Sequence, residues 1–177
     1  MICPTCNHDN VPGAEVCEHC LQDLACLDLP IAQDRVQRSL MHDPISVLKP
    51  QPPITIRDTA SLRQAIATMI EGNIGAVLVL DAADKLVGIF SERDLLLKVV
   101  GKPEVDNNRS VRDFMTHNPE GVTAHDTLAF VLHKMDSGGY RHLPILEGGK
   151  VVGVISVRDM LRHFTLLCKA SIHSRGD

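Results

Sequence analysis

Four of the six cysteines form two Cys-x-x-Cys pairs, a spacing that suits a metal ion. The pairs CPTC and CEHC stand ten residues apart and supply Cys3, Cys6, Cys17 and Cys20. A two-residue gap lets both thiolates of one turn bind the same ion, and two such turns complete a tetrahedron around zinc, or around iron as its tetrahedral substitute. Disulfides are disfavoured without an export signal, and a redox pair would not need a second copy. We therefore expect a closed four-cysteine zinc site.

A second candidate for chemistry is a motif that occurs twice, as GIFSERD at residues 88–94 and as GVISVRD at residues 153–159. In each copy an apolar strand runs into a serine at the N-cap position of a helix, Ser91 or Ser156. Asp94 and Asp159 then stand at the third helical position, where a carboxylate can accept a hydrogen bond from the backbone of the cap. One copy alone predicts only a capped helix, so the repetition needs a further explanation.

The motif lies inside a longer repeat that must position it. An offset of 66 residues aligns Ile45 with Val111 and Leu62 with Leu128, and a one-residue deletion between the turns DAADK and EGGK reduces the offset to 65. Each repeat reads as a short strand, a helix, two strands joined as a hairpin, and a second helix. The apolar strands are continuous, so helices are expected to cover them.

Local signals set the bounds of the predicted elements. The first repeat has a helix starting near Asp58 or Thr59 with Leu62, Ile66, Met69 and Ile70 on one face and Gly72-Asn73 at its end, strands GAVLVL and LVGIF, and a helix from Ser91 to about Val100. The second repeat has a helix from about Thr127 to Asp136, strands RHLPIL and KVVGVI, and a helix from Ser156 to about Leu167. A further helix, roughly Ala32 to Met41, precedes the proline-rich passage KPQPPI.

This order of elements, given twice, resembles the tandem cystathionine β-synthase (CBS) domain pair, often called a Bateman module. The resemblance covers about residues 43–167 and rests on VLVLDAADKLVGIFSERDLL and RHLPILEGGKVVGVISVRDML, both close to the signature of that family. It implies an α/β (α+β) fold in which two half-domains are related by a pseudo-twofold axis and their sheets pack together. We assign residues 43–103 to the first repeat and 104–170 to the second, with a linker helix at 25–42 and a flexible tail at 171–177.

The resemblance also implies clefts between the half-domains that bind adenosine-containing ligands. In the family the aspartate holds the ribose hydroxyls, the serine or threonine three residues earlier helps with ribose or phosphate, and neighbouring strand residues hold adenine. Capping is compatible with this role, because a carboxylate accepts both hydroxyls of a diol and a helix N-terminus attracts phosphate. The ligand-binding residues expected in this chain are Ile56, Ile74, Ser91, Arg93, Asp94, Val122, Thr123, Tyr140, Arg141, Pro144, Ser156, Arg158 and Asp159.

The two clefts are not expected to bind a ligand with equal affinity. Arg141 offers a planar guanidinium for phosphate oxygens, and Gly75 at the equivalent place cannot replace it. Tyr140 is placed to lie against adenine, with plain packing as the alternative, and His142 is interpreted as a structural or solvated edge residue. The arginines that precede the two aspartates are candidates for phosphate contacts, with a solvated helix surface as the alternative. We therefore expect the cleft at Asp159 to be the tighter site.

Residues 1–24 resemble the short zinc-ribbon family through CPTC, Gly13-Ala14 and CEHC. Asn7 and Leu21 replace the glycine that comes after each pair in that family, and asparagine tolerates the left-handed conformation better than leucine does. The segment contains four acidic residues and no Lys or Arg, and four thiolates around a divalent metal add further negative charge. Phosphate would be repelled, so a structural cap or a docking surface for a basic protein partner is expected rather than a nucleic-acid contact.

Composition and motifs exclude several classes of protein. A formal net charge of −4 and 3% aromatic residues argue against a nucleic-acid binder. No apolar run approaches the roughly 18 residues of a membrane span, and the first residues do not resemble a signal peptide, so we expect a cytoplasmic protein. There is no P-loop, GxSxG or HExxH motif, and a site closed by four sulfurs has no open position for water. We therefore expect no enzymatic activity.

These observations predict a regulatory module. AMP, ADP or ATP is expected to occupy the clefts and to bias the arrangement of the CBS pair, which a partner contacts. S-adenosylmethionine and NAD are alternative ligands, because recognition of the ribose does not identify the group attached to its 5′ carbon. Two different functions stay open, a nucleic-acid-associated regulator that uses the ribbon and a scaffold with empty clefts. The family resemblance also implies a homodimer through exposed apolar helix faces.

Overall fold

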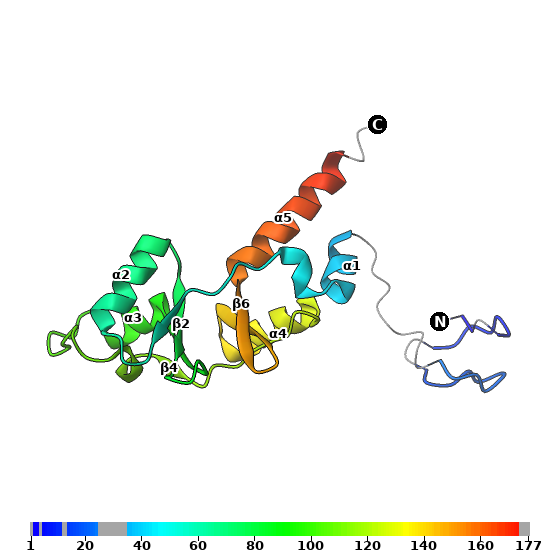
Figure 1. Ribbon diagram of the computed structural model, residues 1–177. Helices are drawn as coiled ribbons and strands as arrows, with labels where there is room; N and C mark the ends of the chain where they lie inside the picture. The colour runs from blue at the N-terminus through cyan, green and yellow to red at the C-terminus, as the bar shows by residue number, and fades with distance from the viewer. Residues whose placement is uncertain (1, 4, 12–13, 25–34, 174–177) are drawn as a thin grey trace. The chain divides into compact units, whose positions relative to one another are not determined.

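The computed structural model describes residues 2–3, 5–11, 14–24 and 35–173, and it separates into two units, Met1–Gln33 and Asp34–Asp177 (Figure 1). Most of the predicted linker and the end of the predicted tail lie outside the described residues. Among the residues described, no helix combines the length and the apolar character needed to span a bilayer. The smaller unit carries the four cysteines, and the larger unit carries both repeats.

The larger unit contains α-helices, short 3₁₀ turns and strands in the predicted order. The helices are α1 (Arg35–His42), α2 (Leu62–Gly72), α3 (Glu92–Lys98), α4 (Leu128–Gly138) and α5 (Val157–His173), and the 3₁₀ turns are η2 (Ile45–Leu48) and η3 (Val111–Asp113). The strands are β1 (Thr55–Arg57), β2 (Ala76–Leu80), β3 (Leu86–Ser91), β4 (Thr116–His117), β5 (His142–Glu147) and β6 (Lys150–Ser156).

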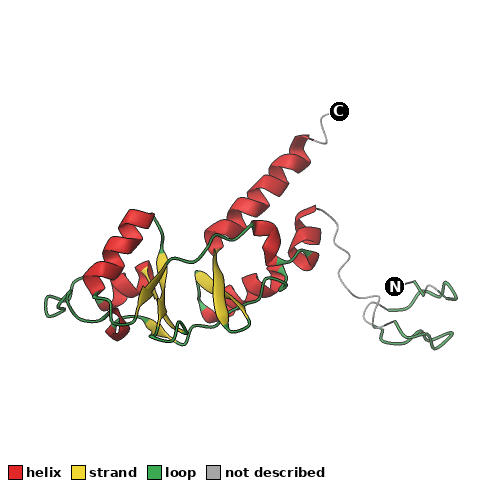
Figure 2. Ribbon diagram, in the orientation of Figure 1, coloured by secondary structure: helices red, strands yellow, loops and turns green. Residues whose placement is uncertain are grey.

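The strands form two sheets that lie between helices (Figure 2). The first sheet has the order β1-β2-β3-β4, with β1 parallel to β2 and the other pairs antiparallel. The second sheet pairs β5 with β6, and Val122 adds a parallel bridge to Ile145. Both hairpins end in the same register, because Ser91 lies opposite Ala76 and Ser156 lies opposite His142. The two serines that begin the repeated motif's helices are therefore equivalent in three dimensions.

Each repeat completes the core of the other repeat. Val111, which precedes the strands of the second repeat, is buried with Leu62 of the first. Ile45, which precedes the strands of the first repeat, is buried with Leu128 of the second. The offset of 66 residues maps one arrangement onto the other, as a pseudo-twofold relation requires. The two repeats therefore form one body rather than two independent domains.

The helix ends follow the local sequence. In α2, Ser61 and Gln64 form a capping box, and Asn73 ends the helix in the left-handed conformation. In α4, Thr127 is the cap and Gly139 ends the helix, also in the left-handed conformation. Helix α5 extends beyond its predicted end at residue 167, because no glycine or proline interrupts the chain before its last helical residue. Residues 171–173, predicted as part of a flexible tail, therefore belong to α5.

Candidate functional site

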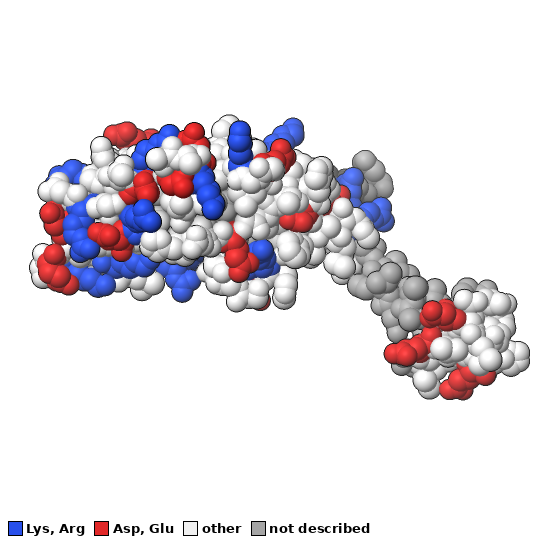
Figure 3. Space-filling view, turned by 60° about the horizontal axis from the view of Figure 1, so that its bottom comes forward, with Lys and Arg blue, Asp and Glu red and all other residues white. Residues whose placement is uncertain are grey.

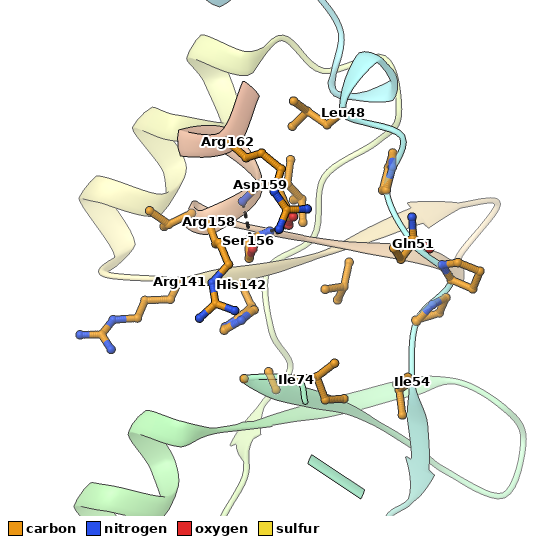
Figure 4. Close-up of a pocket in the computed structure, with 18 of the residues that line it drawn as sticks. Leu48, Gln51, Ile54, Ile74, Arg141, His142, Ser156, Arg158, Asp159 and Arg162 are labelled. Carbon is orange, nitrogen blue, oxygen red and sulfur yellow. Dashed lines mark hydrogen bonds between the residues drawn. The ribbon is translucent and has the colours of Figure 1, made fainter. Parts of the chain in front are cut away.

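A cleft of about 680 Å³ lies between the two repeats of the larger unit (Figure 4). This volume is in the range of small-molecule sites. We name it the Asp159 cleft. Its walls come from residues 48–54, from residues 73–76 and Glu92 of the first repeat, and from Arg141, His142, residues 154–159 and Arg162 of the second.

A serine–aspartate pair at the start of α5 faces this cleft. Asp159 Oδ2 accepts hydrogen bonds from the backbone N–H of Ser156 at 2.9 Å and from its Oγ at 2.6 Å (Figure 4). The backbone N–H of Asp159 donates to Ser156 Oγ at 3.3 Å. None of the described residues donates a hydrogen bond to Oδ1 of Asp159. The half-buried carboxylate thus caps the helix with one oxygen, while its other oxygen accepts no hydrogen bond from the described residues.

The equivalent pair in the first repeat is used differently. Asp94 Oδ2 accepts from the N–H of Ser91 at 3.0 Å and from its Oγ at 2.6 Å, as in the second repeat. Its Oδ1, however, lies 3.0 Å from Thr116 Oγ1 and 2.7 Å from Lys98 Nζ. Asp94 is only 7% exposed. Burial by itself opposes ionisation, but Lys98, Ser91 and Thr116 together lower the pKa of Asp94. Both oxygens of this carboxylate are therefore engaged within the protein.

Two sequence differences explain why the pairs diverge. The position of Thr116 corresponds to Pro50 in the other repeat, and proline has neither a hydroxyl nor an N–H to donate. The position of Lys98 corresponds to His163, whose Nε2 lies 2.8 Å from Ser39 Oγ on α1. Neither replacement donates to Asp159. These substitutions leave the outer oxygen of Asp159 facing the cleft.

The arginines that precede the two aspartates also differ. Arg93 donates from Nη1 to the carbonyl of Gly139 at 3.0 Å, so it connects the first repeat to the end of α4. Arg158 has no such contact among the described residues and lines the Asp159 cleft. In Figure 4 the guanidinium of Arg162 lies beside the Ser156–Asp159 pair, that of Arg158 lies near His142, and Arg141 extends outwards. The second repeat therefore presents cations to the cleft.

His142 lies on the cleft wall that joins the two repeats. Its imidazole packs against Gly75, where an added Cβ would lie 3.1 Å from the ring. Burial lowers the pKa of His142, although the carboxylates of Glu92 and Asp159 oppose this effect. A neutral imidazole at this position offers one hydrogen-bond donor and one acceptor to a ligand.

The structure brings five of the predicted ligand-binding residues together. The residues that line the Asp159 cleft are Ile74, Arg141, Ser156, Arg158 and Asp159. The other predicted residues lie elsewhere. Ser91, Asp94 and Arg93 make the internal contacts given above, Val122 and Pro144 are buried in the second repeat, and Ile56 packs against the core of the first. Tyr140 donates its hydroxyl to Glu120 Oε1 at 3.3 Å, and the backbone N–H of the exposed Thr123 donates to Asp126.

Sequence reasoning missed one complete wall of the cleft. The passage KPQPPI at residues 49–54 is predicted only as proline-rich, and the sequence-based prediction of the site does not include Glu92, His142 or Arg162. The offset of 66 residues supplies a signal, because it aligns Pro50 with Thr116, the first residue of β4 in the first sheet. The carbonyl of Gln51 accordingly lies beside Gly153 of β6, although prolines prevent a regular ladder there. Comparing Pro50 and Gln51 with their equivalents in β4, which lie inside the aligned repeat, would have indicated this wall.

The second candidate site is the four-cysteine cluster of the smaller unit. The Sγ atoms lie within 4.8 Å of one another, with 3.5 Å between Cys3 and Cys20 and 3.6 Å between Cys6 and Cys17. A Zn–S distance of about 2.3 Å in a tetrahedron separates the sulfurs by about 3.8 Å. The cluster therefore fits a tetrahedral metal ion, which would bind all four thiolates.

The backbone of the smaller unit folds both cysteine pairs alike. The N–H of Asn7 donates to the carbonyl of Cys3, and the N–H of Leu21 donates to that of Cys17, each at 2.9 Å. Asn7 and Leu21 have φ angles of 56° and 60°, so both adopt the left-handed conformation in place of the expected glycine. Burial opposes ionisation of Cys17, but backbone N–H groups and the Asn10 amide outweigh it and lower its pKa to about 6. A thiolate, the form that binds metal, is thus favoured there.

The family of the larger unit is shown by comparison with known proteins. The family model for the CBS domain matches this chain twice, at residues 39–101 and 111–165. The chain belongs to the CBS domain family. The tandem CBS pair and the mixed α and β fold predicted from the sequence are thereby confirmed.

Individual known proteins are also similar to this chain. The CBS-domain containing protein ATU1752 from Agrobacterium tumefaciens is 32% identical, with a TM-score of 0.64 over 68% of this chain and 98% of that chain. The CBS domain protein PAE2072 from Pyrobaculum aerophilum, complexed with AMP, is 25% identical, with a TM-score of 0.63 over 70% and 95%. An uncharacterized 17.7 kDa protein from Acidianus ambivalens is 33% identical over 60% of this chain and 64% of the relative. The part of this chain that matches five further curated relatives spans only 20% to 43% of their own length.

Proposed function

We propose that this protein is a regulatory module that binds one adenine nucleotide per chain in the Asp159 cleft. The observation that carries the proposal is the uneven use of two equivalent carboxylates. Asp159 keeps one oxygen towards a cleft of about 680 Å³, whereas both oxygens of Asp94 are bound within the protein. A ribose diol is the group that such an oxygen beside a helix N-terminus can recognise.

The rest of the cleft suits the base and the phosphates of a nucleotide. Ile54 and Ile74 supply apolar surface at the junction with the first repeat, where a base would be shielded from water. In the first turn of α5 the N–H of Val157 donates to the carbonyl of Arg141 and that of Asp159 donates to Ser156 Oγ, so among these described residues the N–H of Arg158 is available to a phosphate. Arg158 and Arg162 add positive charge there. Because the AMP-bound relative shares this fold over most of its length, its ligand supports the proposal.

The proposed response is regulatory rather than catalytic. The cleft is built from both repeats, so a bound nucleotide would bias how the two halves are held together. Helix α1 is coupled to this arrangement, because Ser39 Oγ contacts His163 one turn after Asp159 and also donates to Asp43 at 2.6 Å. A partner that contacts α1 or the preceding segment would sense the occupied state.

The smaller unit is proposed to be a zinc ribbon that docks a basic protein partner. On the face shown in Figure 3, this unit presents carboxylates and no Lys or Arg. Ile2, Val11 and Leu21 are each at least 65% exposed, so apolar contacts are also available to a partner. Repulsion of phosphate by this charge favours a protein over a nucleic acid.

Calorimetric titration with adenosine, AMP, ADP, ATP, S-adenosylmethionine and NAD tests the proposed function. We expect a saturable site for adenine nucleotides with one ligand per chain. Binding of S-adenosylmethionine or NAD alone would assign the cleft to one of these two ligands instead. If none of the six compounds binds, the regulatory nucleotide function is wrong.

A further inference from the structure

The Asp159 cleft contains cations that the ribose contact does not explain. Lys49, Arg141, Arg158 and Arg162 line it, opposed by the carboxylates of Glu92 and Asp159. In the part of the chain that the structure describes, none of these four cations forms an ion pair.

The first repeat shows the contrasting arrangement. Near the equivalent Ser91–Asp94 pair, Lys98 forms an ion pair with Asp94 at 2.7 Å, and Arg93, the equivalent of Arg158, donates to the carbonyl of Gly139 at 3.0 Å. The Asp159 cleft therefore holds excess positive charge in a way that the equivalent region does not. An enclosed surface with one sign of charge attracts a ligand of the opposite sign.

The spacing of the two α5 arginines indicates how long the anionic part of the ligand is. Arg158 and Arg162 stand four residues apart, so their backbones are separated by about 6 Å along the helix. Figure 4 places the guanidinium of Arg162 beside the Ser156–Asp159 pair and that of Arg158 nearer His142. One phosphate group is smaller than this spread, whereas a chain of two or three phosphates can contact both guanidinium groups.

Lys49 adds a cation from the opposite wall. It ends η2 with φ 50° and ψ 61°, a left-handed conformation that is uncommon for lysine. The equivalent residue, Met115, is buried and is not in this conformation. An unfavourable backbone that places a charge at a cleft is the kind of local strain found at ligand sites. The cleft therefore presents cations from both sides.

We infer that the Asp159 cleft selects adenosine ligands that carry two or more phosphates, ADP or ATP, over AMP. The inference rests on the proposed function and specifies its ligand. S-adenosylmethionine is disfavoured by the same charges, because its sulfonium would face Arg158 and Arg162. Specificity thus comes from α5 and the proline-rich wall, while Asp159 recognises the ribose that all these ligands share.

The test compares ligands and variants by calorimetry at low salt without divalent cations. For the full-length protein we expect affinity to rise about tenfold from AMP to ADP, since each further phosphate gains charge-assisted hydrogen bonds. Arg158→Gln, Arg162→Gln and Lys49→Gln should each weaken ATP binding by about tenfold and leave adenosine binding unchanged. Arg63→Gln, an equal change of charge on the exposed surface of α2, is the matched control and should not alter either affinity. Thermal melting of each variant confirms that it is folded.

Several results would overturn the inference in distinguishable ways. Equal affinities for adenosine, AMP and ATP, or tighter binding of S-adenosylmethionine, would contradict phosphate selection and still show that the cleft binds adenosine compounds. No binding of any compound would reject the proposed function together with this inference. Loss of adenosine binding in the folded arginine variants would show that these side chains hold the nucleoside and not a phosphate chain.

Discussion

The two equivalent aspartates should separate stability from ligand binding. We predict that Asp94→Asn destabilises the larger unit and leaves nucleotide affinity nearly unchanged. Asp159→Asn should weaken nucleotide binding and leave the stability of the larger unit nearly unchanged. Both substitutions conserve size and remove one charge, so each variant is the matched control of the other.

The expected loss of stability in each variant follows from the contacts that the substituted side chain makes. Asparagine at residue 94 loses the ion pair with Lys98 and one of the acceptor oxygens that Ser91 and Thr116 use. Removing one partner of a fully buried pair costs about 3–5 kcal/mol, and the 38% exposure of Lys98 reduces this to about 2–3 kcal/mol. That loss corresponds to a melting temperature lower by about 8 °C. At residue 159 only the cap contacts to Ser156 are weakened, so the expected cost is about 0.5 kcal/mol.

Nucleotide affinity should fall in Asp159→Asn and stay nearly unchanged in Asp94→Asn. Asp159→Asn removes charge-assisted hydrogen bonds to the ribose worth roughly 1.5–3 kcal/mol each, so nucleotide affinity should fall by about tenfold or more. Urea unfolding of the larger unit and calorimetry, performed on both variants, measure the two quantities. Equal losses of affinity in the two variants would mean that both clefts bind nucleotide. A lowered stability of Asp159→Asn with unchanged affinity would mean that GVISVRD is only a helix cap.

Three further predictions concern acid stability, metal and assembly. Because folding lowers the pKa of Asp94, its contribution to stability is present above the unfolded-state pKa and is lost as the pH falls through the folded-state value. Unfolding titrations below about pH 4 should therefore show a steeper loss for the wild type than for Asp94→Asn, and parallel curves would count against this role. Chelation should unfold residues 1–24 and leave the CBS pair folded, since four-thiolate zinc peptides gain on the order of 10 kcal/mol from the metal. Elemental analysis that finds less than half an equivalent of zinc and iron combined, in protein made with metal supplied, would reject this site. Exposed Leu96 and Leu97 on α3 and Leu161 and Leu166 on α5 should form an isologous dimer contact, which a monomer mass in light scattering at tens of micromolar would contradict.

Most of the fold could be predicted from the sequence, because the signals for strands, turns and helix ends occur in both repeats. The hairpins β2–β3 and β5–β6 have continuous apolar strands and polar turns, and the ends of α2 and α4 coincide with Asn73 and Gly139. Periodicity was less reliable within a helix. Ile70 was expected on the buried face of α2 but is 74% exposed, while Ala65 is fully buried there. The small side chain of Ala65 carries too little apolar signal to mark the face.

The candidate site could be predicted only in part, because its asymmetry depends on residues distant in sequence. The capping pairs at Ser91 and Ser156 are local, and the sequence predicted both. Whether the second oxygen of each aspartate remains available depends on a residue distant in sequence. Thr116 donates to the second oxygen of Asp94, whereas its equivalent Pro50, which lines the Asp159 cleft, has no group to donate to Asp159. Tertiary packing decides this difference, so it becomes visible only when the two repeats are placed side by side.

Native mass spectrometry of the metal-loaded protein with saturating ATP tests the central claim most directly, because it counts ligands and metal ions on each chain. The claim that one carboxylate serves the fold and its equivalent serves the ligand predicts one nucleotide and one metal ion per chain, and a much lower nucleotide occupancy in Asp159→Asn than in the wild type when ATP is reduced to the wild-type Kd. Two nucleotides per chain, or one nucleotide that remains in Asp159→Asn and is lost in Asp94→Asn, would contradict it.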